Sequence, residues 1–226
     1  MGTQEHSGVD AVKERTHIYL VRHGEVKNPK KLFYGRLPYF GLNNRGRLQV
    51  EKLSEFFKNT KVGAIYASPL LRSRQTAQAL HRYHPKVKVH FSKLLLEWGN
   101  PLWEGNNYYD RNSKLVGIYR ETPTKLHIKG AENMYDIEKR MVKKISNIIE
   151  NHHGENVVIV SHGDPIRIAG LHYKSESLDD LHNKACTNAS ITALVFNGGK
   201  LIQSDYKEIH PRAEETFWTK TRKELA

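Results

Sequence analysis

The sequence predicts an α/β fold, a three-layer α/β/α sandwich with a mostly parallel central sheet. Short apolar runs alternate with stretches whose apolar residues recur at helical spacing, and this order is typical of strands joined by helices in a parallel sheet. The chain has 226 residues, which is enough for one domain with a sizeable core. We therefore expect a single domain built on one sheet.

The first half of the chain supplies three expected strands and two expected helices. Residues 17–21 and 64–67 are short apolar runs that predict buried strands, and residues 87–91 predict a third, shorter strand. Residues 45–58 and 72–83 place apolar side chains at helical spacing. The elements therefore alternate from the first strand onward.

The second half continues the alternation. Residues 134–150 have a long amphipathic pattern that predicts a helix, and residues 157–160 form the clearest central strand. Another helix is expected to start near Pro165, because proline is favoured in the first turn of a helix. Residues 191–196 and 201–205 are expected to close the sheet as a pair of strands.

Three segments lie outside this alternation. Residues 1–15 are expected to form a polar N-terminal tail and residues 207–226 a charged C-terminal tail, which leaves residues 16–206 as the domain. Residues 100–129 have weak periodicity and many turn-forming residues. We expect this segment to be an inserted cap over one end of the sheet.

Composition narrows the functional classes. The chain has 36 Lys and Arg residues against 24 Asp and Glu residues, a formal charge of +12 that predicts attraction to anions. No apolar run approaches the ~20 residues of a transmembrane helix, so a membrane-spanning protein is excluded. The single cysteine, Cys186, excludes an internal disulfide and a cysteine-rich zinc site. The first residues lack an apolar signal region, and a cytoplasmic protein without a membrane partner is expected.

Two expected strands end in the same way. The first runs into Arg22-His23-Gly24 and the later one into His162-Gly163. One His-Gly pair after a strand is usually a turn, but two pairs in matching contexts favour a site. Because ligands of α/β sheets bind at the carboxyl ends of the strands, we expect the two histidines to share a site there.

Paired histidines beside an arginine suit phosphoryl transfer. A neutral histidine can accept a phosphoryl group on a ring nitrogen. The reaction then needs fixed positive charge for the phosphoryl oxygens and an acid that protonates the leaving oxygen. Arg22 adjoins His23, Arg72 follows the second strand, and Glu97 follows the third. These residue types therefore make phosphoryl transfer the leading hypothesis.

Four sequence blocks contain these residues: LVRHGE at 20–25, ASPLLR at 67–72 with QTA at 75–77, Glu97 with WEG at 103–105, and VSHG at 160–163. Together the blocks resemble the histidine phosphatase superfamily, which includes cofactor-dependent phosphoglycerate mutases and many phosphomonoesterases. They occur in the family's order over roughly residues 16–205. The resemblance implies an α/β phosphatase or mutase.

The resemblance also assigns roles to individual residues. It implies that His23 is the phosphorylated nucleophile and that Glu97 is the proton donor, with Glu104 as the competing acid. Arg22, Arg72 and His162 would bind the phosphoryl group, so that no metal or other cofactor is expected.

Three further residues are candidates for the substrate site. Gly24 would permit a turn and a close approach of the ligand to the backbone. Arg36 lies in a loop that matches a recurrent family loop near the substrate entrance. Asn28 follows His23 by five positions, whereas the usual family asparagine follows by six.

The sequence therefore predicts a metal-independent phosphomonoester hydrolase that acts on a small phosphorylated metabolite through a phosphohistidine. The first alternative is a cofactor-dependent phosphoglycerate mutase. Such mutases generally carry a longer insertion between the acid and the second histidine, whereas Glu97 and His162 are 65 positions apart. The second alternative is a catalytically inactive basic module that binds phospholigands or nucleic acid. The presence of every catalytic residue type disfavours it, and we expect no nucleic-acid partner and a monomer or homodimer.

Overall fold

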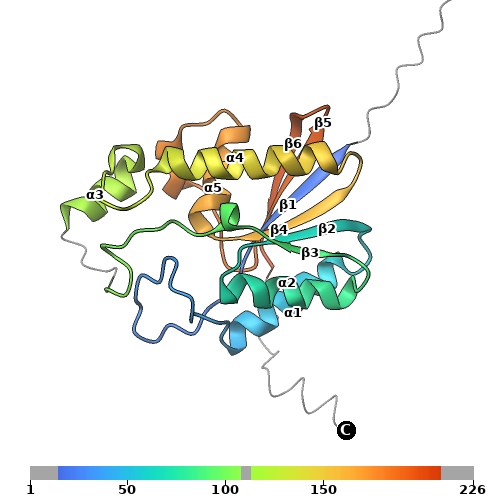
Figure 1. Cartoon of the computed structure of the whole chain (residues 1–226), viewed down its shortest axis with the longest axis horizontal. Coiled ribbons are helices and arrows are strands. Elements are labelled where there is room, and N and C mark those ends of the chain that lie inside the picture. Colours follow the sequence, from blue (N-terminus) through green and yellow to red (C-terminus); the bar gives the residue numbers. More distant parts are fainter. Residues whose placement is uncertain (1–14, 108–112, 210–226) are drawn as a thin grey trace, which may run out of the picture.

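A computed structural model of the chain describes residues 15–107 and 113–209. These residues form one six-stranded sheet with the strand order β3-β2-β4-β1-β5-β6 (Figure 1). The predicted tails at 1–15 and 207–226 lie almost wholly outside the described residues. The strands are β1 (Thr16–Arg22), β2 (Val62–Ala67), β3 (Val89–Phe91), β4 (Asn156–Ser161), β5 (Ile191–Asn197) and β6 (Lys200–Lys207).

Most of the strand pairs are parallel, as predicted. Strand β4 lies between β1 and β2 and is parallel to both, and β3 is parallel to β2. The closing pair is antiparallel: β5 pairs with β1, and β6 pairs with β5. The three-layer α/β prediction is confirmed.

Helices cover both faces of the sheet. They are α1 (Asn44–Phe57), α2 (Leu71–Tyr83), α3 (Lys114–Glu121), α4 (Met134–Asn151) and α5 (Gly163–Tyr173). Ile18 and Leu20 of β1 belong to the apolar cluster that α4 and α5 complete, whereas Val21 belongs to the cluster with α1 and α2. Figure 1 shows these two helix pairs on opposite sides of the sheet.

Helix α4 illustrates why these residues form these elements. Ile137, Met141 and Ile145 recur at helical spacing and are fully buried against the sheet. The Asn133 side chain accepts a hydrogen bond from the Asp136 backbone at 3.0 Å, and the Asp136 side chain accepts one from the Asn133 backbone at 3.0 Å. A cap of this kind contributes about 1 kcal/mol, so the start of α4 is well defined.

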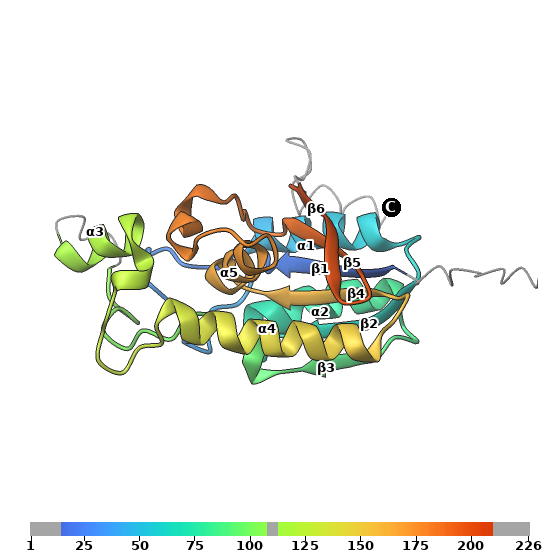
Figure 2. The same cartoon turned by 90° about the horizontal axis from the view of Figure 1, so that it is seen from above.

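The predicted insertion at 100–129 contains α3 and a short 3₁₀ helix, Pro123–Lys125. Figure 2 places α3 on the side toward which the β1 and β4 arrows point. The hydroxyl of Tyr119 in α3 donates a hydrogen bond to Asp164 at the start of α5 (2.7 Å). The insertion therefore contacts the end of the sheet where ligands of parallel sheets bind.

None of the helices within residues 15–107 and 113–209 has the length and apolar character that a membrane span requires.

Candidate active site

The parallel pairing of β1 and β4 brings the two predicted histidines together. Arg22 at the end of β1 is in register with Ser161 at the end of β4, so the residue after each strand reaches the same edge of the sheet. The His23 and His162 rings are both fully buried, with centroids 5.1 Å apart. A second contact fixes the first histidine, because the Asn188 amide donates to the carbonyl oxygen of His23 at 3.1 Å.

The hydrogen bonds of His23 define its tautomer. Its Nδ1 atom lies 2.7 Å from the carbonyl oxygen of Gly24, and a carbonyl only accepts, so Nδ1 carries the proton. Nε2 therefore presents a lone pair, which accepts a hydrogen bond from Nε of Arg72 at 3.2 Å. Burial, with the nearby Arg72 and Arg22 charges, holds the pKa of His23 well below 6.5. His23 is thus a neutral imidazole whose unprotonated nitrogen, Nε2, faces Arg72.

Backbone carbonyls orient both arginines. Arg72 is buried in the first turn of α2, and its Nη2 atom donates to the Gly35 carbonyl at 2.7 Å. Its guanidinium also lies 4.8 Å from the centre of the Tyr34 ring. Arg22 donates from Nη1 to the carbonyl of Cys186. The two positive charges are therefore fixed before a ligand binds.

Three buried nitrogen atoms around His23 have no hydrogen-bond partner in the part of the chain that the structure describes. They are Nε of Arg22, Nη1 of Arg72 and Nδ1 of His162. His162 Nε2 lies 2.8 Å from the Ser68 hydroxyl, which can donate to it, and its Nδ1 atom then carries a proton. A buried donor without a partner costs about 1–3 kcal/mol, so a ligand with several acceptor oxygens would stabilise this arrangement.

Glu97 is the acid that faces this cluster. Burial, followed by the neighbouring Asp164 charge, raises the pKa of Glu97 to about 7. Its Oε1 atom accepts a hydrogen bond from the Trp98 backbone at 2.9 Å. The competing acid, Glu104, instead accepts a hydrogen bond from the Arg36 backbone at 2.7 Å and does not line the cavity. The geometry therefore favours Glu97 over Glu104.

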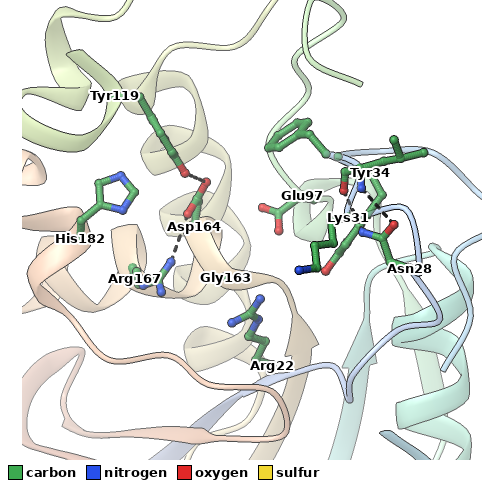
Figure 3. Close-up of a pocket in the computed structure, with 13 residues that line it drawn as sticks. Arg22, Asn28, Lys31, Tyr34, Glu97, Tyr119, Gly163, Asp164, Arg167 and His182 are labelled. Carbon is green, nitrogen blue, oxygen red and sulfur yellow. Dashed lines mark hydrogen bonds and ion pairs between the residues drawn. The ribbon is translucent and has the colours of Figure 1, made fainter. Parts of the chain in front are cut away.

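A cavity of about 370 Å³ opens beside Glu97 and Arg22. Figure 3 shows Asp164 and Arg167 on one wall and Asn28, Lys31 and Tyr34 on the other, with Glu97 and Arg22 between them. The remaining lining residues are Leu32, Phe33, Gly35, Tyr119, Gly163 and His182. Cavities of this size hold whole small metabolites.

The structure places the three further candidates differently from one another. Asn28 lines the cavity, but its side-chain amide is bonded to the Leu32 backbone (2.8 and 3.0 Å). Arg36 does not line the cavity: its guanidinium is paired with Glu132 at 2.6 Å. A Cβ atom on Gly24 would lie 2.7 Å from the backbone oxygen of Gly46. Gly24 therefore allows a close approach between the strand end and α1.

The contacts that support Glu97 come from residues that the sequence did not point to. Glu132 bridges Arg36 and Arg140, accepting from Arg140 Nε at 2.8 Å. Both arginines also donate to the carbonyl oxygen of Glu97, Arg36 at 2.9 Å and Arg140 at 3.2 Å. Arg140 lies within an amphipathic helix, where an arginine usually belongs to a solvated face, so no local signal pointed to it.

The cavity wall opposite Lys31 is also built from residues that were not among the predicted site residues. Asp164 accepts hydrogen bonds from Tyr119 at 2.7 Å and from Arg167 at 3.3 Å (Figure 3). The His182 ring packs edge-on against Tyr119, with centroids 4.4 Å apart. The position of Asp164, two residues after His162, was the one available signal.

Among the described residues, no group of three or more His, Cys, Asp or Glu side chains is placed to hold a metal ion.

Comparison with known proteins identifies the family. A sequence profile of the histidine phosphatase superfamily (branch 1) matches residues 18–208. The chain belongs to the histidine phosphatase superfamily. The prediction of a phosphatase of this family is thereby confirmed.

Individual relatives of this histidine phosphatase cover most of its length. An uncharacterised protein of Mycobacterium tuberculosis is 29% identical over 204 residues, covering 86% of this chain and 97% of that protein. Phosphoserine phosphatase 1 of Hydrogenobacter thermophilus is 26% identical over 181 residues, which cover 78% of this chain and 85% of that protein. The solved structure of YhfR from Bacillus stearothermophilus has the same fold, with a TM-score of 0.77 at 23% identity over 89% of this chain and 98% of that chain.

Proposed function

We propose that the protein is a metal-independent phosphomonoester hydrolase that passes the phosphoryl group through Nε2 of His23 to water. The observation that carries this proposal is a set of three buried nitrogen atoms without partners among the described residues, on Arg22, Arg72 and His162, whose side chains lie close to the His23 ring. Phosphoryl transfer spreads negative charge over the equatorial oxygens, and fixed donors stabilise that charge. The family match and the phosphatase among the relatives support the same chemistry.

The first step forms the phosphohistidine. The Nε2 lone pair of His23 attacks phosphorus, and the bond between phosphorus and the ester oxygen breaks. Arg22, Arg72 and His162 bind the phosphoryl oxygens while Glu97 donates its proton to the leaving oxygen. Because its pKa is raised to about 7, a large fraction of Glu97 is protonated near neutral pH.

The second step regenerates the enzyme. Water attacks the phosphorus of phospho-His23, and Glu97, now ionised, takes a proton from that water. The bond between phosphorus and Nε2 breaks, and inorganic phosphate leaves. The size of the cavity supports a small phosphorylated metabolite as the substrate.

The test is hydrolysis of p-nitrophenyl phosphate in excess EDTA by the wild-type protein and by His23→Asn, with His153→Asn as control because His153 is exposed and remote from the site. We expect the wild-type and His153→Asn proteins to retain activity and His23→Asn to lose at least ~10³-fold. Rapid quenching should trap a base-stable, acid-labile phosphoprotein in the wild type and in His153→Asn, but not in His23→Asn. Loss of activity in EDTA that Mg²⁺ restores, or equal activity in His23→Asn, would contradict the proposal.

The products separate hydrolysis from the mutase alternative. With 3-phosphoglycerate as the substrate, a hydrolase releases inorganic phosphate, whereas a mutase forms 2-phosphoglycerate. Predominant formation of 2-phosphoglycerate would overturn the hydrolase assignment and retain the phosphohistidine.

A further inference from the structure

We propose that Lys31 is a specificity-determining residue that binds a second anionic group of the substrate, so that the substrate class is phosphomonoesters carrying another anion, such as a carboxylate, near the phosphoryl group. This inference rests on the proposed function, because it concerns the same cavity. Lys31 lies on the wall opposite Asp164 and Arg167 (Figure 3).

The backbone of Lys31 adopts an unusual conformation that the surrounding turn holds. Its φ angle is +52°, in the left-handed region that disfavours residues with a side chain. The Lys31 amide donates to the Asn28 carbonyl at 3.1 Å, and the Asn28 side chain binds both the amide and the carbonyl of Leu32. Such a conformation costs about 1–3 kcal/mol and persists only where the surrounding structure holds it. Here it belongs to a residue that lines the cavity.

The next residues anchor this turn to the core. The Phe33 amide donates to the Asn106 carbonyl, and the Gly105 amide donates to the Phe33 carbonyl, both at 2.9 Å. The Phe33 ring packs edge-on against Trp98 and Trp103, with centroids 5.9 and 5.8 Å apart. The backbone at Lys31 is therefore held from both sides, by the Asn28 turn and by the aromatic core, whereas the residue itself is exposed.

The charges of the cavity leave the Lys31 ammonium available. Arg22 lines the cavity and is assigned to the phosphoryl group in the proposed function, together with Arg72, which is hydrogen-bonded to His23 and does not itself line the cavity. Arg167 is held by Asp164 at 3.3 Å and by the carbonyl of Lys184 at 2.9 Å. Within the described residues, the Lys31 ammonium has no carboxylate partner. Of the lysine and arginine residues that line this cavity, Arg22 is assigned to the phosphoryl group and Arg167 is paired with Asp164, which leaves Lys31.

The remaining polar residues of the cavity do not replace Lys31. Burial lowers the pKa of His182, so its ring is neutral near pH 7. Asp164 is negative and both of its carboxylate oxygens are occupied. A substrate whose phosphoryl group binds beside His23 therefore meets one uncommitted positive charge on the opposite wall, at Lys31. An anion is the group that such a charge recognises.

The experiment compares two competitors that differ in one group. 3-Phosphoglycerate and glycerol 3-phosphate have the same carbon chain, but the first carries a carboxylate where the second carries a hydroxymethyl group. The ratio of their inhibition constants against p-nitrophenyl phosphate is measured for the wild-type protein, Lys31→Met and Lys31→Arg. Lys30→Met is the matched control, because Lys30 is exposed and does not line the cavity.

We expect the wild-type protein to prefer 3-phosphoglycerate by about 10- to 100-fold, the range for one charge-assisted contact. Lys31→Met should lower this preference to within about 3-fold, Lys31→Arg should restore part of it, and Lys30→Met should keep it. A wild-type ratio near one, or an unchanged ratio in Lys31→Met, would overturn the proposal. In particular, if Lys31 binds the phosphoryl group instead, Lys31→Met would weaken the binding of both competitors together and leave the ratio unchanged.

The result does not depend on the phosphohistidine. If the wild-type protein does not hydrolyse p-nitrophenyl phosphate, calorimetric titration with the same two compounds gives the ratio of dissociation constants directly. A selective loss in Lys31→Met would then support the second-anion site even where the catalytic proposal fails.

Discussion

Nε of Arg72 donates a hydrogen bond to Nε2 of His23 at 3.2 Å, although Nε2 is the atom that would attack phosphorus. The arginine therefore occupies this lone pair in the free protein, and in the proposed reaction it would exchange the lone pair for phosphoryl oxygens when the substrate binds. The second terminal nitrogen of Arg72 stays on the Gly35 carbonyl at 2.7 Å, so the guanidinium keeps its orientation during this exchange. A planar donor group can make both contacts at once, whereas an ammonium is a single point charge.

Arg72→Lys should therefore lower kcat/KM for p-nitrophenyl phosphate by about 10²- to 10³-fold, although the positive charge is kept. The control is Arg74→Lys, because Arg74 is exposed and its guanidinium lies over the Phe91 ring at 4.8 Å. Steady-state kinetics on both variants decide the matter. Equal losses in the two would show that the geometry at Arg72 has no special role.

The assignment of Glu97 as proton donor predicts a dependence on the leaving group. Glu97→Gln should lower kcat/KM for an alkyl ester such as glycerol 3-phosphate by about 10²- to 10³-fold, and much less for p-nitrophenyl phosphate, whose leaving group needs little protonation. Glu104→Gln is the matched control, because its side chain still accepts the hydrogen bond from the Arg36 backbone. If Glu104→Gln showed the selective loss instead, Glu104 would be the acid.

The pKa of Glu97 predicts the pH range of activity. Its protonated form is needed for the first step, so kcat/KM should fall as the pH rises through about 7. The Asp164 charge helps to raise this pKa, whereas Arg72 and Arg22 lower it. Asp164→Asn removes the negative charge, and Glu97 should then ionise at lower pH, which moves the basic limb of the profile toward acid.

The control for that shift is Tyr119→Phe, which removes the 2.7 Å hydrogen bond to Asp164 but keeps the Asp164 charge. Profiles of kcat/KM are measured between about pH 5 and 9. The basic limb of Tyr119→Phe should lie close to that of the wild type, and the basic limb of Asp164→Asn should lie further toward acid. A limb that does not move in Asp164→Asn would mean that burial alone keeps Glu97 protonated.

The parts of the fold and site that follow local rules could be predicted from the sequence. The expected strand at 157–160 lies within β4, and the expected helix at 134–150 lies within α4, because period and apolar content determine such elements. The meeting of His23 and His162 was predictable as well, since each follows a strand of a parallel sheet.

Contacts between distant segments could not be predicted. The Arg36 guanidinium is 96 positions from Glu132, and nothing in its loop indicates that it supports the backbone of Glu97 rather than a substrate. Tyr119 and Asp164 are 45 positions apart, and Tyr119 lies in a segment with weak periodicity. Such pairs depend on how the insertion folds over the sheet, which no single stretch of sequence determines.

The close packing behind His23 gives a prediction about stability. A Cβ atom at position 24 would lie 2.7 Å from the Gly46 carbonyl oxygen and 2.8 Å from Cγ1 of Val50, so Gly24→Ala must displace the backbone of α1 or the strand end. Overpacking of this kind costs about 1–3 kcal/mol. Because His23 is the neighbouring residue, the displacement should also lower kcat.

The matched control is Gly170→Ala within α5, where a Cβ atom would meet nothing within 4 Å. Alanine is favoured over glycine in a helix by about 0.8–1 kcal/mol, so this variant should unfold at the same or a slightly higher denaturant concentration than the wild type. Urea unfolding with activity assays on both variants tests the pair. Wild-type stability in Gly24→Ala would show that α1 can move away from the strand end, and unchanged kcat would show that His23 does not depend on that contact.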